Sequence, residues 1–317
     1  MSILRRVGRS DLEIFPIALG ANVFGWTADL QESFRVLDAY VEASGNFLDT
    51  SDSYSFWAPG NQGGESERVI GEWLFSRKTR DRVLIATKVS QHPEFTGIDP
   101  ATIDRGIDAS LARLGVDHVD LYYAHFDEPG KPLDPTARAF SRLVDSGKIR
   151  HIGISNFTVP RIEEWLRIAD AEGLHRPVAL QTAYNLMDRS IEDDLLPLAR
   201  REEIGVMTYW ALARGFLTGK YRTGAGDSTS PRAEAAAGML TDRGRRVLAV
   251  VDAISADRDV HPATVAIAWL LSRDGVVAPI ASARDPEQLD PILQAVAFPL
   301  TLKERDALDV ASAREAT

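Results

Sequence analysis

The sequence contains no cysteine among its 317 residues. Disulfide bonds, thiolate nucleophiles and cysteine-ligated zinc are therefore excluded, and the chain is compatible with a reducing compartment. No stretch approaches the roughly 18 consecutive apolar residues that a transmembrane helix requires. The first ten residues lack the apolar segment of a secretory signal peptide. We therefore expect a cytoplasmic protein without a membrane span.

Positive charge is also scarce relative to negative charge. Lysine and arginine total 36 residues against 46 aspartates and glutamates, which gives a formal net charge of −10. Broad binding to nucleic acid or to anionic lipid needs basic patches, so neither partner is expected. The six histidines show no paired spacing such as H-x-x-x-H, so no metal site is expected. A small molecule remains as the expected partner, and the oligomeric state cannot be inferred from these features.

Short apolar runs alternate along the chain with segments of helical periodicity. Strands are expected at residues 17–25, 46–49, 83–89, 119–125, 149–154, 178–182, 205–209 and 276–281. Parallel neighbours need crossover helices, and eight such units fit a closed α/β barrel, the (β/α)8 TIM barrel. An open doubly wound sheet is the alternative, but no G-x-G-x-x-G follows the first strand.

The whole chain, residues 1–317, is expected to form a single domain. Extra helices are predicted after the seventh strand, at 242–256 and 262–272, and at the C-terminus, at 301–314. The Gly-rich and Ser-rich composition between the seventh strand and the first of these helices predicts a mobile loop at residues 223–238.

Four ionisable residues lie at or just beyond the ends of neighbouring strands: Asp49, Tyr54, Lys88 and His125. Catalytic groups of a parallel barrel come from the C-terminal ends of several strands. Asp49 and Lys88 alone would equally suit a structural ion pair. Tyr54 favours chemistry, because a neighbouring ammonium lowers the pKa of a phenol and makes it a better general acid. Asp49 would then orient Lys88, and Lys88 would tune Tyr54.

Two further residues of this region have simpler interpretations. His125 follows an apolar run, where a lone histidine is more often structural, although beside Tyr54 it is also placed to orient a carbonyl oxygen. Asp52, three residues after Asp49, is interpreted as a helix cap or a solvated loop charge.

Neutral polar residues end the next strands. Ser155 and Asn156 follow the fifth strand, Gln181 lies in the sixth, and Tyr209 ends the seventh. Serine and asparagine are common at the start of a helix, so capping of the next helix is the alternative role of Ser155 and Asn156. A buried glutamine must find hydrogen-bond partners, however, and these amide and hydroxyl groups together suit a planar carboxamide ligand. Tyr209 is placed to stack on such a ring.

An anion site is indicated after the eighth strand. Residues 280–288 contain small residues, then Arg284, then a helix start, and helix N-termini attract phosphate. Lys220 and Arg232, after the seventh strand, are candidates for additional positive charge. The alternative is that Ser282 or Asp285 only begins a helix and that the two cations are solvated.

Taken together, these residues resemble the aldo-keto reductase superfamily over residue 19 to about residue 296. The resemblance rests on the runs Asp49-Thr-Ser-Asp-Ser-Tyr54, Thr87-Lys88, Gly153-Ile-Ser-Asn156 and Tyr184-Asn185, together with His125 and Gln181. The run Gly215-Phe-Leu-Thr-Gly-Lys220-Tyr resembles the branch that includes bacterial sugar reductases and potassium-channel β subunits.

The resemblance implies a catalytic tetrad of Asp49, Tyr54, Lys88 and His125, with NADP(H) extended across the barrel mouth. It implies that the nicotinamide end is held by Ser155, Asn156, Gln181 and Tyr209, the pyrophosphate by Trp210, Leu212, Gly215 and Lys220, and the 2′-phosphate end by Ser282, Arg284 and Gln288. The family often has Glu-Asn three and four residues after this last glutamine. Here Pro291 and Ile292 occupy those positions, so the adenine contacts must differ.

The predicted activity is reduction of an aldehyde or ketone, including open-chain or keto sugars, by hydride transfer with Tyr54 as the acid. Aromatic residues just past the strand ends are expected to form the substrate wall: Trp26, Phe56, Trp57, Phe126 and Tyr184. Two alternatives remain open at this point. One is a cofactor-sensing regulatory subunit with slow turnover, and the other is a lyase that forms a Schiff base on Lys88.

Overall fold

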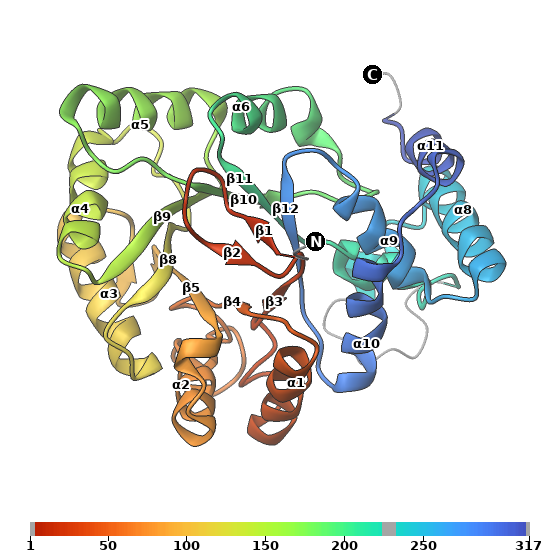
Figure 1. The fold of residues 1–317 in the computed structure, drawn as a ribbon, viewed down its shortest axis with the longest axis horizontal. Coiled ribbons are helices and arrows are strands. Elements are labelled where there is room, and N and C mark those ends of the chain that lie inside the picture. Colours follow the sequence, from red (N-terminus) through yellow and green to blue (C-terminus); the bar gives the residue numbers. More distant parts are fainter. Residues whose placement is uncertain (1–3, 224–232, 315–317) are drawn as a thin grey trace.

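A closed barrel of eight parallel strands forms the centre of the molecule, as predicted (Figure 1). The computed structural model describes residues 4–223 and 233–314. In chain order the barrel strands are β3 (Ala18–Gly20), β4 (Phe47–Asp49), β5 (Leu84–Val89), β8 (Val119–Ala124), β9 (Ile149–Ser155), β10 (Ala179–Ala183), β11 (Gly205–Tyr209) and β12 (Val276–Ala281). Each strand pairs with its chain neighbour, and β12 closes the barrel on β3.

Helices surround this barrel because their apolar stripes pack on the outer faces of the strands. They are α1 (Leu30–Glu42), α2 (Glu65–Arg77), α3 (Pro100–Leu114), α4 (Asp134–Asp145), α5 (Val159–Glu172), α6 (Leu195–Arg201), α7 (Ala233–Ala237), α8 (Asp242–Arg258), α9 (Pro262–Leu271), α10 (Pro286–Gln294) and α11 (Leu302–Ala311). The predicted extra helices correspond to α8, α9 and α11. No helix in the two described ranges has the length and apolarity needed to cross a membrane.

The secondary structure departs from expectation in three places. The first strand is only three residues long, and a short hairpin of β6 (Gln91–His92) and β7 (Phe95–Thr96) follows β5. Part of the predicted loop at 223–238 folds as α7. Residues 224–232 of that loop, including Arg232, lie outside the described residues.

An N-terminal hairpin of β1 (Arg5–Arg6) and β2 (Glu13–Ile14) covers one end of the barrel (Figure 1). Arg5 donates hydrogen bonds to the backbone carbonyl of Val276, at the start of β12, at 3.1 Å. Val7 and Leu12 of the same hairpin pack among side chains of the barrel interior. This hairpin closes the N-terminal end of the strands, so the open end is the one where the strands finish.

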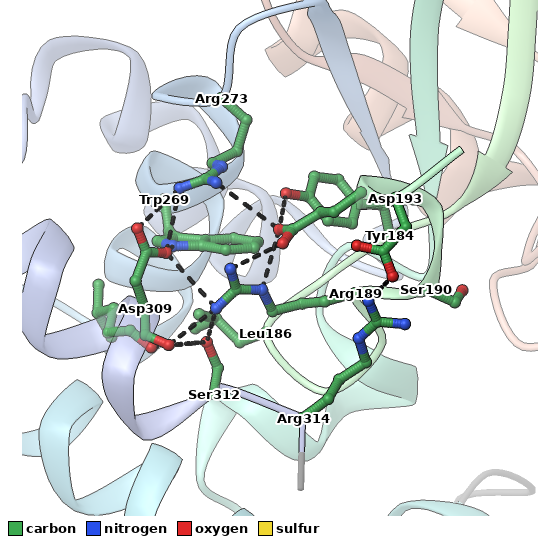
Figure 2. A network of polar contacts seen from close by, with 12 residues as sticks. Tyr184, Leu186, Arg189, Ser190, Asp193, Trp269, Arg273, Asp309, Ser312 and Arg314 are labelled. Carbon is green, nitrogen blue, oxygen red and sulfur yellow. Dashed lines mark hydrogen bonds and ion pairs between the residues drawn. The ribbon is translucent and has the colours of Figure 1, made fainter. Parts of the chain in front are cut away.

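The C-terminal helix α11 is tied to the barrel by a polar network (Figure 2). Asp309 accepts hydrogen bonds from the Trp269 indole at 2.8 Å and from Arg273 at 2.9 Å. Arg189 donates to the Asp309 carbonyl and to the Ser312 hydroxyl, and the Trp269 ring lies between Arg189 and Arg273. The segment after β10 is therefore held by α9 and α11.

Candidate active site

The four ionisable residues singled out in the sequence meet at the open end of the barrel. Asp49 is the last residue of β4, Lys88 lies near the end of β5, and His125 directly follows β8. Tyr54 comes from the loop after β4. Because parallel strands end at the same rim, side chains up to 76 residues apart in sequence (125 − 49) converge there.

The lysine ammonium is the centre of this group. Lys88 Nζ donates to Asp49 Oδ2 at 2.8 Å, to the Thr50 carbonyl at 2.6 Å and to the Tyr54 hydroxyl at 3.0 Å. These three acceptors match the three N–H donors of an ammonium. The side chains of Lys88 and Asp49 are 0% and 1% exposed, so this ion pair is shielded from water. The Tyr54 hydroxyl is also within 3.4 Å of Asp49 Oδ2.

The charge balance around Tyr54 differs from the prediction. Burial raises the pKa of Tyr54 well above its ordinary value, and the Asp49 carboxylate raises it further. The expectation that Lys88 leaves this phenol with a lowered pKa is therefore wrong. Burial also lowers the pKa of Lys88, and Asp49 opposes that shift. Tyr54 is consequently a neutral phenol with a proton to give, and Lys88 is placed to stabilise the oxygen after the proton leaves.

His125 stands beside this pair as a neutral imidazole. Burial lowers the pKa of His125 well below its ordinary value, and the Lys88 charge lowers it further. Its ring centre is 6.3 Å from that of Tyr54, and its Nδ1 is 3.5 Å from the Ser51 hydroxyl. Nε2 is therefore the ring nitrogen left for a ligand in the pocket.

A cavity of about 740 Å³ begins at these residues and runs toward the N-terminus of α10. Of the side chains predicted for catalysis and binding, it is lined by Asp49, Tyr54, His125, Trp26, Phe126, Asn156, Gln181, Tyr209, Trp210, Leu212, Gly215, Lys220, Ser282, Arg284 and Gln288. Lys88 lies just beneath the surface of the cavity, bonded to Asp49 and Tyr54. The volume lies in the range of small-molecule and cofactor sites.

The two amide side chains near these four residues are held by neighbouring protein groups. Gln181 Nε2 donates to Asp49 Oδ1 at 2.8 Å, so the amide nitrogen is engaged by the Asp49 carboxylate. Asn156 donates to the His125 carbonyl at 2.9 Å and accepts from the Tyr209 hydroxyl at 2.8 Å. Ser155 is buried, does not line the cavity, and accepts a hydrogen bond from Asn156. A planar ligand here would meet the cavity faces of Asn156, Gln181 and Tyr209, with Ser155 behind them.

The far end of the cavity carries positive charge. Arg284 and Lys220 line it, and neither has a carboxylate partner within the described residues. Asp285 caps α10 by accepting from the Gln288 backbone at 2.8 Å, which bears out the plain reading of Asp285 as a helix start. Ser282 does not cap the helix but donates to Asn22 at 2.7 Å. Glu287 is the one acidic side chain among the described residues that line this end.

The structure adds cavity residues that sequence reasoning missed. Among them are Asn22, Thr27, Arg214, His261 and Glu287, and the cavity wall also includes Pro291 and Ile292, the two positions singled out in the sequence. Asn22 follows a strand end and was within reach of the same reasoning that found His125. Arg214 was not, because it reaches the cavity through left-handed backbone at Trp210, Ala213 and Arg214 itself. Its guanidinium lies 3.9 Å from the Trp210 ring centre.

Only two of the five residues predicted for the aromatic wall line the cavity. Trp26 and Phe126 line the cavity, and the Phe126 ring centre is 5.0 Å from that of His125. Trp57 lies behind them, edge-on to Trp26 at 5.5 Å and 6.3 Å from Tyr54. Phe56 packs on Trp57 and does not line the cavity.

Tyr184 was wrongly assigned to the substrate wall. Its side chain is fully buried, and its hydroxyl donates to Glu192 at 2.5 Å. It belongs to the network of Figure 2, where its ring packs against Trp269. The position after β10 predicted a pocket residue, but the chain turns outward there toward α9.

Comparison with known proteins agrees with this geometry. The model of the aldo/keto reductase family matches residues 16–313, and the chain belongs to that family. It is 31% identical to an uncharacterized oxidoreductase, YrpG, of Bacillus subtilis, over 93% of this chain and 91% of the relative. It is 33% identical to a putative voltage-gated potassium channel subunit beta of Schizosaccharomyces pombe, over 93% and 88%. An aryl-alcohol dehydrogenase of Pestalotiopsis microspora is 26% identical over 93% and 78%. The chain is thus an oxidoreductase of a family that generally uses nicotinamide cofactors.

Proposed function

We propose that this protein is a cytoplasmic, NADP(H)-dependent reductase that converts an aldehyde or ketone to an alcohol. The observation that carries the proposal is the contact of the buried Lys88 ammonium with both Asp49 and Tyr54 at the mouth of a long cavity. A lyase that forms a Schiff base on Lys88 is not favoured, because all three ammonium hydrogens are engaged by protein acceptors.

Each residue of the group has a separate task in this reaction. A nicotinamide held at this end of the cavity would supply the hydride for the carbonyl carbon. Tyr54 gives its phenolic proton to the developing alkoxide, and Lys88 stabilises the phenolate that remains. Asp49 fixes Lys88, and Gln181 in turn fixes Asp49. His125 holds the carbonyl oxygen with Nε2. Alcohol oxidation uses the same groups in reverse.

The volume and the charge distribution of the cavity suit such a cofactor. Its carboxamide end would lie against Asn156, Gln181 and Tyr209, with Ser155 supporting Asn156. The pyrophosphate would follow Trp210, Leu212, Gly215 and Lys220, and the 2′-phosphate would meet Ser282, Arg284 and Gln288. Pro291 and Ile292 give the adenine an apolar surface in place of polar partners.

A comparison of NADPH with NADH binding tests whether Arg284 holds the 2′-phosphate. NADPH is expected to quench the intrinsic tryptophan fluorescence at lower concentration than NADH, since Trp26 and Trp210 line the cavity. Arg284→Ala should weaken NADPH binding about tenfold or more and leave NADH binding unchanged, because a charge-assisted hydrogen bond contributes about 1.5–3 kcal/mol. Arg167→Ala, which removes an exposed arginine of α5 outside the cavity, is the matched control. Equal affinity of the unmodified protein for both cofactors would show that the phosphate assignment is wrong.

The cavity walls favour a neutral aromatic or apolar carbonyl compound over a sugar. Among the described lining residues, Asp49 and His125 are the acidic and basic side chains at the Tyr54 end. The other acidic and basic lining side chains come from the segments after β11 and β12. Beside Tyr54 the wall is Trp26 and Phe126, whose aromatic faces offer stacking, and the indole N–H of Trp26 is the one side-chain donor of this pair, too few for a row of hydroxyls. The fungal relative named for aryl alcohols is consistent with this class.

Substitution of the aromatic wall should therefore change substrate preference. Trp26→Leu is expected to raise KM for 4-nitrobenzaldehyde about 3- to 10-fold, the value of an aromatic pair contact, with little change for glyceraldehyde. Phe75→Leu, at an exposed aromatic of α2 outside the cavity, is the control. A wild-type enzyme that uses glyceraldehyde more efficiently than the aromatic aldehyde would contradict the assignment while leaving carbonyl reduction itself intact.

A cofactor-sensing regulatory subunit is the second candidate, and the similarity to a channel subunit supports it. Steady turnover separates the two functions, because a sensor would bind cofactor without sustained oxidation of NADPH by excess aldehyde.

A further inference from the structure

Asp52 is a buried acid that the reaction described so far does not use. The expectation of a cap or a solvated loop charge is wrong, because the residue is 0% exposed. Its Oδ1 lies 3.1 Å from the Ser51 hydroxyl, and its Oδ2 has no hydrogen-bond partner. A carboxylate buried with one oxygen unsatisfied is costly, whereas a neutral carboxylic acid is much less so.

The surroundings of Asp52 hold a second buried acid. Glu67 of α2 is also 0% exposed, and it accepts hydrogen bonds from Thr87 and Arg113. Burial raises the pKa of Asp52 to about 8, and the charge of Glu67 adds to the rise. The cations Arg113 of α3 and Lys88 of β5 oppose it. Two neutral groups complete the surroundings, the Tyr122 phenol of β8 and the His92 imidazole of β6 next to Gly63.

Ser51 connects this acid to the active site. Its hydroxyl lies 3.1 Å from Asp52 Oδ1 on one side and 3.5 Å from His125 Nδ1 on the other. Ser53 is a third neighbour, with its hydroxyl 3.1 Å from that of Ser51 and its backbone N–H donating to the Ser51 oxygen. Asp52, Ser51 and His125 thus form a chain that ends at the imidazole beside Tyr54.

The hydrogen bonds that link Asp52, Ser51 and His125 can be donated in either of two directions. When Asp52 is protonated, it donates to Ser51, Ser51 donates to His125 Nδ1, and the imidazole proton sits on Nε2. When Asp52 is ionised, Ser51 donates to the carboxylate and accepts from Nδ1–H, so Nε2 carries only a lone pair. Only the first arrangement gives a hydrogen bond to a substrate carbonyl oxygen.

We propose that Asp52 is a positioning residue that acts through Ser51 to fix the imidazole proton of His125 on Nε2, facing the substrate. The proposal rests on the proposed carbonyl reduction for its consequence, but the placement of the proton is a property of the protein alone. Since the Ser51–His125 distance is long for a hydrogen bond, the coupling is modest, and severalfold rate effects are expected.

The pH dependence of the reduction follows from the direction of the hydrogen bonds between Asp52 and His125. Below pH 8 the acid holds its proton and His125 donates from Nε2. As pH rises through about 8, Asp52 ionises and the tautomer reverses, so kcat/KM for reduction falls severalfold. Asp52→Asn keeps the shape, cannot ionise and can donate to Ser51. This variant should retain activity at pH 7 and lose the decline between pH 7 and 9. Asp306→Asn, an exposed carboxylate of α11, should leave the profile unchanged.

The tautomer is read directly by long-range ¹H–¹⁵N correlation spectra of the histidine rings, with His125→Asn identifying the His125 signals. We expect the Nε2–H form at pH 6.5, a shift toward Nδ1–H by pH 9 in the wild type, and a pH-independent Nε2–H form in Asp52→Asn. Ser51→Ala should remove the pH response without fixing either form. An Nδ1–H tautomer at pH 6.5, or the same alkaline shift in Asp52→Asn, would overturn the proposal even in an active enzyme.

Protonation of Asp52 has an independent readout in stability. The folded protein keeps a proton that the unfolded chain releases above about pH 4, so unfolding free energy should fall with rising pH between 5 and 8. Asp52→Asn should abolish that part of the dependence. If wild type and variant show parallel stability profiles, Asp52 is ionised throughout and the inference fails. Loss of all aldehyde turnover with the tautomer shift intact would instead count against the proposed function alone.

Discussion

Tyr54→Phe is expected to lower kcat for aldehyde reduction about 10²- to 10⁴-fold, the usual contribution of a general acid. In the proposed reaction the phenol gives the proton, since its raised pKa keeps it protonated and its hydroxyl contacts Lys88 and Asp49 at the cavity. Phenylalanine keeps the ring against Trp57 and removes only the hydroxyl. Cofactor binding, measured by tryptophan fluorescence, should therefore be unchanged while the absorbance decay of NADPH slows.

Tyr184→Phe provides the matched control for this substitution. It also removes a phenol that contacts a carboxylate, but that carboxylate, Glu192, accepts from Arg189 of the structural network of Figure 2. A hydrogen bond to a charged group contributes about 1.5–3 kcal/mol, so this variant should lose stability and keep its turnover number. If Tyr54→Phe retains more than a tenth of the wild-type kcat, another group donates the proton. If the wild type itself shows no steady turnover, the regulatory-subunit candidate gains.

Much of the site could be predicted because a parallel barrel places strand ends at one rim. The positions of Asp49, Lys88 and His125 follow from locating β4, β5 and β8 in the sequence. The polarity of the cavity follows similarly from the cations that come after β11 and β12. These inferences need only strand order and strand ends, which local sequence patterns specify.

What escaped prediction depends on packing between distant elements. Asp52 is buried because α2 and α3 bring Glu67 and Arg113 over it, and no local pattern shows that contact. The pKa of Tyr54 rises because of burial and because of the neighbouring Asp49 carboxylate, and spacing along the chain gives neither the burial nor the contact. Tyr184 was misplaced for the same reason, since Trp269 and Glu192 come to it from outside the barrel.

Lys88→Met is expected to destabilise the protein by about 3–5 kcal/mol and to abolish measurable reduction. The pair formed by Lys88 and Asp49 is almost fully buried, and removal of one partner leaves the other charge uncompensated in the core. Gln181 and the Tyr54 hydroxyl would be the remaining side-chain donors to Asp49 among the described residues, and neutral donors do not replace an ammonium. The Tyr54 hydroxyl would also lose the donor that stabilises its phenolate. Urea unfolding gives the free energy, and NADPH oxidation gives the rate.

The double variant Asp49→Asn with Lys88→Met separates the two roles of this pair. Without either charge, no ion is stranded in the core, so most of the lost stability should return, because neutral replacement of a buried ion pair is often tolerated. Activity should not return, since the phenolate of Tyr54 would still lack a cation. Lys148→Met breaks a solvent-exposed pair with Asp108 and should cost at most about 1 kcal/mol. If the double variant is no more stable than Lys88→Met, the lost stability comes from the packing of the lysine side chain. If the double variant regains turnover, Lys88 has no part in the proposed chemistry.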